Sequence, residues 1–97
     1  MSKLNCVKHS KRSNAFELTL LGYISQAVSN CEELDEARRM LQSDMDNAKR
    51  TSTATLAGSY RIEDKGTYFN VLHINSTGDA DRCVATVYAM PVKEVAA

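Results

Sequence analysis

The sequence predicts an α+β fold in which one long amphipathic helix packs on an antiparallel sheet of about five strands. Two observations support this prediction. A stripe of apolar residues at helical spacing runs through the middle of the chain, and the half that follows is rich in Val, Thr and Tyr. The expected order of elements is β-β-α-β-β-β, and the alternative order is α-α-β-β-β. The 97 residues fit a single domain over 1–97.

The N-terminal part of the chain admits two interpretations. Leu4 to Lys8 fits a short strand, whereas Ala15 to Val28 fits either a strand or a helix. Gly22 costs about 1 kcal/mol in a helix interior and is tolerated as a bulge in a strand. We therefore favour a β-hairpin formed by these two segments, with a helix over the second one as the alternative.

A helix is predicted from Glu32 to Lys49. Ser29 or Asn30 is expected to cap its N-terminus. Acidic residues gather in its first turns and basic residues at its end, an order that suits the helix dipole. Its apolar stripe, with steps of three or four residues, consists of Leu34, Ala37, Leu41, Met45 and Ala48.

Three strands in an antiparallel meander are predicted after this helix. They run over Leu56–Ile62, Thr67–Asn75 and Cys83–Met90. Turns are expected at Glu63–Gly66 and Ser76–Asp79, where Gly66 can adopt a positive φ. Alternation along the second strand places Phe69, Val71 and His73 on one face and Tyr68, Asn70, Leu72 and Ile74 on the other.

The composition is that of a folded domain without strong charge. The chain has 12 basic and 12 acidic residues, and 43% of its residues are apolar. These values exclude a disordered tail, a collagen-like fibre and a domain that is basic throughout.

Three cysteines, at positions 6, 31 and 83, form no C-x₂-C pair, so we expect reduced thiols and a cytoplasmic location. No apolar run of about 18 residues is present, so no membrane partner is expected.

The motifs of enzymes, metal sites and cofactor sites are missing from the sequence. His9 and His73 are the two histidines, and no G-x-S-x-G motif or glycine-rich phosphate loop accompanies them. Cys31 lies beside two glutamates that oppose a thiolate, so we expect this thiol to be unreactive. The chain is therefore expected not to be an enzyme, and no catalytic residue, metal or cofactor is assigned.

A protein-binding surface is the main functional expectation. Tyrosines fall on neighbouring predicted strands, and tyrosine is enriched at protein interfaces. With one sheet face covered by the helix, the other would carry some of these tyrosines with Thr and Asn, as a docking or homodimer face. Ordinary cross-strand packing is the alternative. The candidate residues are Tyr60, Tyr68 and Tyr88, together with the exposed acids of the predicted helix, Glu32, Glu33 and Glu36.

A basic N-terminal segment suggests nucleic acid as the alternative partner. No acidic residue precedes Glu17, so this part of the chain carries a local positive charge that could contact phosphates. No aromatic residue lies among the cations to stack on bases, so a solvated turn is the favoured interpretation of this segment. The residues concerned are Lys3, Lys8, Lys11 and Arg12.

In size and plain composition the chain resembles the small accessory proteins of phages and mobile elements, including anti-CRISPR-type inhibitors. The resemblance implies a protein that inhibits a host complex by occlusion. Taken with the missing enzyme motifs, it leads us to expect a small protein-binding inhibitor or adaptor whose partner is a host protein or protein complex.

Overall fold

Two helices and a four-stranded antiparallel sheet make up the fold. The computed structural model describes residues 4–9, 15–48 and 58–89. The predicted α+β class is confirmed, although the number of elements differs from the expected five strands and one long helix. The elements are β1 (Leu4–Lys8), α1 (Ala15–Asn30), α2 (Leu34–Asn47), β2 (Tyr60–Asp64), β3 (Tyr68–Ile74) and β4 (Ala80–Ala89).

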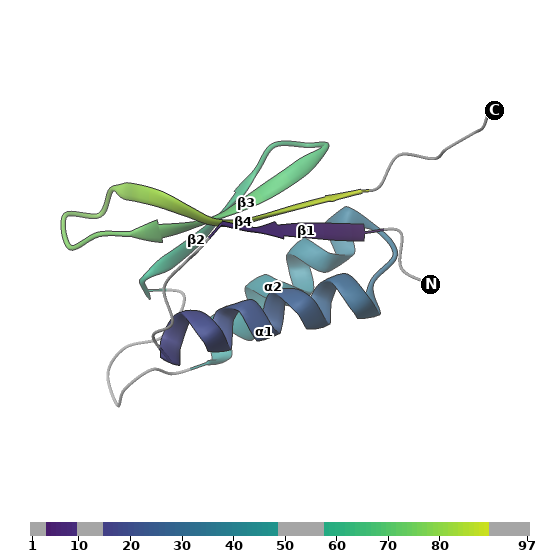
Figure 1. Ribbon diagram of the computed structural model, residues 1–97, viewed down its shortest axis with the longest axis horizontal. Helices are drawn as coiled ribbons and strands as arrows, with labels where there is room; N and C mark the ends of the chain where they lie inside the picture. The colour runs from purple at the N-terminus through teal and green to yellow at the C-terminus, as the bar shows by residue number, and fades with distance from the viewer. Residues whose placement is uncertain (1–3, 10–14, 49–57, 90–97) are drawn as a thin grey trace.

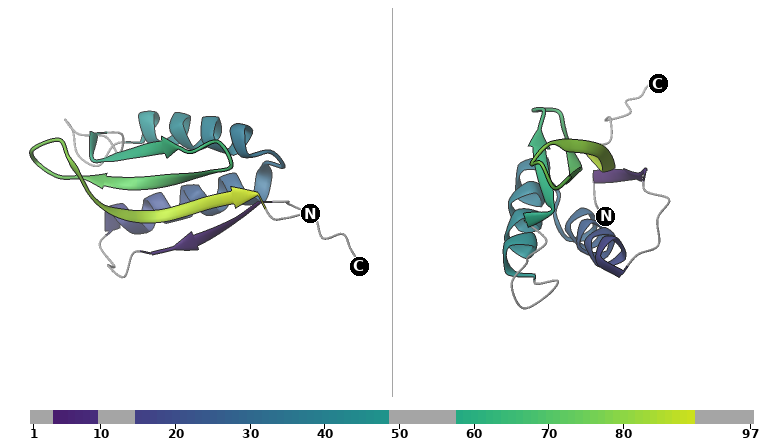
Figure 2. Two further views of the ribbon diagram at one scale, coloured as in Figure 1. Left: turned by 90° about the horizontal axis from the view of Figure 1, so that it is seen from above. Right: turned by 90° about the vertical axis from the view of Figure 1, so that its left-hand side faces the viewer.

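The strands are ordered β1-β4-β3-β2, and each pairs antiparallel with its neighbour. Both helices pack against the same face of this sheet (Figure 1). Seen from above, α1 lies behind β1 and β4, and α2 lies along the β2 side (Figure 2). No element of the described residues covers the opposite face, which we call the open face.

The core lies between the helices and the covered sheet face. Its residues are aliphatic for the most part, and Phe69 is its largest fully buried side chain. Each helix contributes one stripe at spacings of three and four residues, which is the pattern of a helix with one buried face. The fully or almost fully buried members are Leu20, Ile24 and Ala27 of α1, Ala37, Leu41 and Met45 of α2, and Phe69, Val71, Val84, Ala85 and Val87 of the sheet.

The favoured β-hairpin at the N-terminus is wrong in its second half. Leu4–Lys8 is a strand as predicted, but Ala15–Asn30 is a helix. The alternative order had this helix and lacked β1. Gly22 is compatible with the helix because it faces open space, with nothing within 4 Å of an added Cβ. The buried positions 17, 20, 24, 27 and 31 follow steps of three and four, and this helical stripe outweighs the cost of the glycine.

The predicted central helix corresponds to α2, which is shorter than the predicted range. Ala37, Leu41 and Met45 of its apolar stripe are buried as expected, whereas Leu34 and Ala48 are partly buried. The predicted caps are wrong, because Ser29 and Asn30 form the last turn of α1. Glu33 is the N-cap residue of α2, in extended conformation and without a side-chain cap hydrogen bond. Glu36 Oε1 instead accepts a hydrogen bond from the Glu32 N–H at 3.4 Å, which satisfies one donor near the helix start.

The meander has the predicted order with shifted boundaries. β2 includes Glu63 and Asp64, which were expected in the turn, and the earlier part of the predicted strand falls in residues 49–57, outside the described chain. β4 begins at Ala80, before the expected Cys83. Gly66 has a φ of 85° and Gly78 a φ of 90°, so both hairpin turns use a conformation that favours glycine.

Two irregularities in β4 change which side chains face the core. The register against β3 shifts between Val71 and Leu72 and again between His73 and Ile74. Val84 is the extra residue of the first bulge, so it and the adjacent Ala85 are both buried. Asp81 is the extra residue of the second, and this bulge places its carboxylate beside the His73 ring.

Candidate functional site: the open face of the sheet

Alternation along the strands determines which residues form the open face. Because Phe69 and Val71 are buried under the helices, Tyr68 and Asn70 point to the other side of β3, as predicted. Their neighbours in the register extend the face onto the other strands. The open face comprises Asn5 and Val7 of β1, Cys83, Thr86 and Tyr88 of β4, Tyr68, Asn70 and Leu72 of β3, and Arg61 and Glu63 of β2.

A row of hydrogen bonds crosses the open face from His9, which follows β1, to Glu63 of β2. The Thr86 hydroxyl donates to Asn70 Oδ1 at 2.7 Å, and Asn70 Nδ2 donates to Glu63 Oε1 at 3.1 Å. His9 Nε2 lies 3.0 Å from Thr86 Oγ1. Since the only proton of this hydroxyl goes to Asn70, the imidazole donates at Nε2. The direction of every hydrogen bond in the row is therefore fixed, and the polar groups are held in place before any partner arrives.

Tyr68 and Tyr88 lie beside this polar row as direct cross-strand neighbours. The Tyr68 side chain is 38% exposed, and the Tyr88 hydroxyl accepts a hydrogen bond from Asn5 Nδ2 at 3.2 Å. Val7, on the edge strand, is 45% exposed. Half-exposed aromatic side chains with ordered polar neighbours are typical of the central part of a protein interface.

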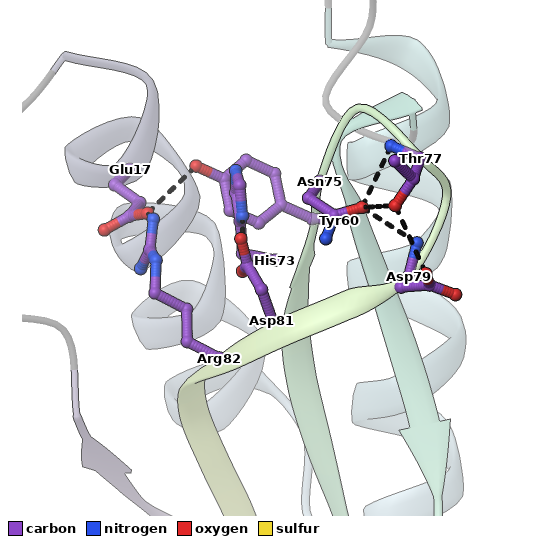
Figure 3. A network of polar contacts seen from close by, with 8 residues as sticks. All are labelled: Glu17, Tyr60, His73, Asn75, Thr77, Asp79, Asp81 and Arg82. Atoms are coloured by element: carbon purple, nitrogen blue, oxygen red, sulfur yellow. Dashed lines mark hydrogen bonds and ion pairs between the residues drawn. The ribbon is translucent and has the colours of Figure 1, made fainter.

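A second polar cluster lies under the sheet, at the start of α1. Glu17 is fully buried, and its Oε1 accepts hydrogen bonds from Arg82 and, at 3.1 Å, from the Tyr60 hydroxyl. The hydrogen bond to Glu17 raises the pKa of the Arg82 guanidinium above its usual range. His73 packs edge-on against the Tyr60 ring, 5.4 Å between centroids, and its Nδ1 lies 2.8 Å from Asp81 Oδ1 (Figure 3).

This cluster joins four elements, since its members come from α1, β2, β3 and β4. A His–Asp pair occurs in hydrolytic sites, where the histidine also contacts a nucleophile. Here His73 contacts Asp81 and the Tyr60 ring. Arg82 and Tyr60 are bound to the Glu17 carboxylate. The arrangement holds the start of α1 against the sheet, which is a structural role.

The β3–β4 turn is ordered by a single side chain. Asn75 Oδ1 accepts hydrogen bonds from the Thr77 hydroxyl at 2.6 Å, from the Thr77 N–H at 3.0 Å and from the Asp79 N–H at 3.0 Å (Figure 3). These contacts, with Gly78 at positive φ, explain the predicted turn. Asp79, the acidic residue of this turn, thus contributes to its local structure.

The predicted site residues are separated by the fold. Tyr68 and Tyr88 share the open face, whereas Tyr60 is 4% exposed on the covered face and bound to Glu17. Lys8 is exposed at the end of β1, and the other three basic candidates, Lys3, Lys11 and Arg12, fall outside the described residues. The three candidate acids, Glu32, Glu33 and Glu36, are exposed at the start of α2, in the helical layer and away from the tyrosines.

No sequence signal pointed to Glu17 or Arg82 as partners, because they are 65 residues apart and come together only in the fold. The sequence predicted part of the polar row, because Thr and Asn residues were expected on the same sheet face as the tyrosines. Its members come from separate strands, so only the register of the sheet places them in line.

Cys31 is expected to be the least reactive thiol of the three. Burial raises its pKa, and the carboxylate of Glu36 raises it further. Its Sγ lies 3.6 Å from Met40 Sδ in a part-buried contact. A raised pKa lowers the thiolate fraction, so iodoacetamide should modify Cys31 far more slowly than Cys6 or Cys83 in the native protein. Mass spectrometry over time measures the rate at which each cysteine is modified. If Cys31 is modified as fast in the native protein as after addition of urea, the expectation is contradicted.

The described residues contain neither a cluster suited to a metal ion nor a membrane-spanning helix. Over residues 4–9, 15–48 and 58–89, no group of three or more His, Cys, Asp or Glu side chains is placed to hold a metal ion. In the same part of the chain, no helix combines the length and the apolar character needed to cross a membrane.

Comparison with known proteins gave no relative. No known family, no curated protein and no solved structure matches this chain.

Proposed function

We propose that this protein is a non-enzymatic binding module that docks a partner protein on the open face of its sheet. One observation carries the proposal: two helices cover one face, and no described element covers the other, which presents Tyr68 and Tyr88 side by side. A sheet face with exposed aromatic residues and no covering layer is a common place for association with a second protein.

The organisation of the open face supports protein binding. The hydrogen-bonded row from His9 to Glu63 holds its side chains in place, so docking loses little side-chain entropy. Arg61 and Glu63 give this face charges of both signs on β2. A protein surface with mixed polar groups and a few apolar anchors matches this chemistry better than a phosphate backbone does.

We further propose that binding inhibits a host complex by occlusion. The size of the chain supports this part of the proposal, as does its resemblance to accessory proteins of phages and mobile elements. An inhibitor that acts by covering a surface requires no catalytic group, and its effect scales with the fraction of target bound. The expected partner is thus a host protein or protein complex, bound stoichiometrically.

An affinity pull-down from the native host tests the proposal, with nuclease added in one arm. We expect a defined protein complex that survives nuclease treatment and is lost in the variant Tyr68→Ala/Tyr88→Ala. The variant removes two aromatic anchors and leaves the core intact, so its circular dichroism should match that of the wild type.

Three results would overturn the proposal. Recovery of nucleic acid alone, or of proteins that disappear with nuclease, would favour the basic residues near the N-terminus, including Lys8. Recovery of a second copy of this chain alone would replace the host partner by self-association. A complex that binds the double variant as well as the wild type would move the contact away from the open face.

A further inference from the structure

Tyr68 and Tyr88 form the closest kind of cross-strand pair on the open face. The Lys65 N–H donates to the Tyr68 C=O at 2.9 Å, so the backbone groups of Tyr68 point toward β2. The pair with Tyr88 is therefore a non-hydrogen-bonded one, in which the two Cα atoms lie about 4.5 Å apart. Within the described residues, no ring–ring contact joins the two side chains. Both rings therefore offer aromatic surface to a partner at one place on the sheet.

Around these rings, the oxygen atoms already accept hydrogen bonds, and protons remain to be donated. Asn5 Oδ1 accepts from the Cys6 N–H at 2.9 Å, and the Tyr88 hydroxyl oxygen accepts from Asn5 Nδ2 at 3.2 Å. A side-chain amide nitrogen has two protons and a hydroxyl has one. Within the described residues, the second Asn5 proton and the hydroxyl protons of Tyr68 and Tyr88 have no protein acceptor. The aromatic pair is thus bordered by donors.

The polar row beside the tyrosines has the same bias. Thr86 Oγ1 lies 3.0 Å from His9 Nε2 and accepts its proton, and Asn70 Oδ1 accepts from Thr86 at 2.7 Å. Asn70 Nδ2 gives one proton to Glu63 and keeps the other. The Glu63 carboxylate lies at the far end of the row, where Lys65 Nζ is 3.6 Å from its second oxygen. The face therefore offers a partner more donors than acceptors.

A segment rich in proline matches this surface. Each proline has a backbone carbonyl that accepts hydrogen bonds and no N–H that would need an acceptor, whereas any other residue carries both. Proline-rich segments adopt the polyproline II conformation, which leaves their carbonyls available, and they dock on aromatic side chains at little cost in conformational entropy. A phosphate backbone also offers acceptors, but it binds through cations. The aromatic end of the face, formed by Asn5, Tyr68 and Tyr88, contains no cation.

We propose that the partner docks on the open face through a proline-rich segment in the polyproline II conformation. Its proline rings pack on Tyr68 and Tyr88, and its carbonyls accept hydrogen bonds from the Tyr88 hydroxyl and from Asn5 Nδ2. This inference rests on the proposed function, since it specifies the chemistry of the partner at the same face.

Selection from a library of random ten-residue peptides on the full chain provides the first test. We expect proline to be enriched among the peptides recovered with the wild type and not among those recovered with Tyr68→Ala/Tyr88→Ala. Recovery of peptides without proline enrichment by the wild type, or equal enrichment by both proteins, would overturn the proposal.

Titration with a fluorescent peptide of ten prolines provides the second test. We expect a Kd below about 1 mM, raised at least about tenfold in Tyr68→Ala/Tyr88→Ala. Tyr88→Phe keeps the ring and removes the donating hydroxyl, so it should raise the Kd about three- to tenfold, as expected for one hydrogen bond. Tyr23→Phe is the matched control, because it makes the same change in a partly buried tyrosine of α1 and should leave the Kd unchanged.

Four results of this titration would overturn the proposal. They are a Kd above about 1 mM for the wild type, equal values for Tyr88→Phe and the wild type, an equal loss in Tyr23→Phe, and tighter binding of a single strand of ten thymidine nucleotides than of ten prolines.

Competition in the pull-down separates this inference from the proposed function. We expect an excess of the ten-proline peptide to displace the host protein. A host protein that is lost in Tyr68→Ala/Tyr88→Ala but is not displaced by the peptide would support docking on the open face and would overturn the proline-rich segment alone.

Discussion

Replacement of Arg82 by alanine should destabilise the protein by about 3–5 kcal/mol, because the fully buried carboxylate of Glu17 then loses its cationic partner. A domain of this length has a total stability of roughly 5–15 kcal/mol, so the variant would be close to unfolding. The melting temperature should fall by roughly 15–30 °C. Urea denaturation followed by circular dichroism measures the change in the free energy of unfolding.

Two further variants show whether the stability lost in Arg82→Ala comes from the unpaired charge of Glu17 or from lost packing of the Arg82 side chain. The double variant Glu17→Leu/Arg82→Leu removes both charges and should recover most of the stability lost in Arg82→Ala, since buried ion pairs contribute little net free energy relative to apolar residues. Arg38→Ala breaks the ion pairs with Asp35 and Asp64, whose carboxylates are exposed, and should change stability little. A loss below about 1 kcal/mol in Arg82→Ala would contradict this account of the Glu17 cluster.

Replacement of Phe69 by alanine should cost about 3–5 kcal/mol, since it leaves a cavity at the largest fully buried side chain. The adjacent residue is a matched control, because Tyr68 is also aromatic and points to the open face. Tyr68→Ala should change stability by no more than about 0.5 kcal/mol. The same urea titration compares them. Equal losses in the two variants would mean that the open face is packed against another part of the molecule.

Much of the fold follows from local patterns in the sequence. The stripe of α2 and the alternation along β3 are regular, and each leads directly to the observed element and its buried face. α1 was predicted as a strand because Gly22 disfavours a helix interior. The buried stripe of the helix also contains a charged residue, Glu17. Only the distant Arg82 makes that position tolerable, and no local pattern contains this information.

The candidate site was predictable where it depends on alternation and not where it depends on register. Tyr68 faces away from Phe69 in any regular strand, so its side of the sheet could be derived. The row through Thr86 and Asn70 requires the pairing of β3 with β4, which contains two bulges. A bulge shifts every later residue to the other face, and the sequence does not reveal where one occurs.

The central claim is that the open face binds a partner protein through Tyr68 and Tyr88. The most direct test is the Kd of the purified partner for wild type and for Tyr68→Ala/Tyr88→Ala, measured by isothermal titration calorimetry. Leu18→Ala is the control, since Leu18 is an exposed apolar residue of α1 on the opposite side of the molecule. The account predicts a Kd increase of about thirtyfold or more for the double variant and none for Leu18→Ala. An unchanged Kd in the double variant would contradict it.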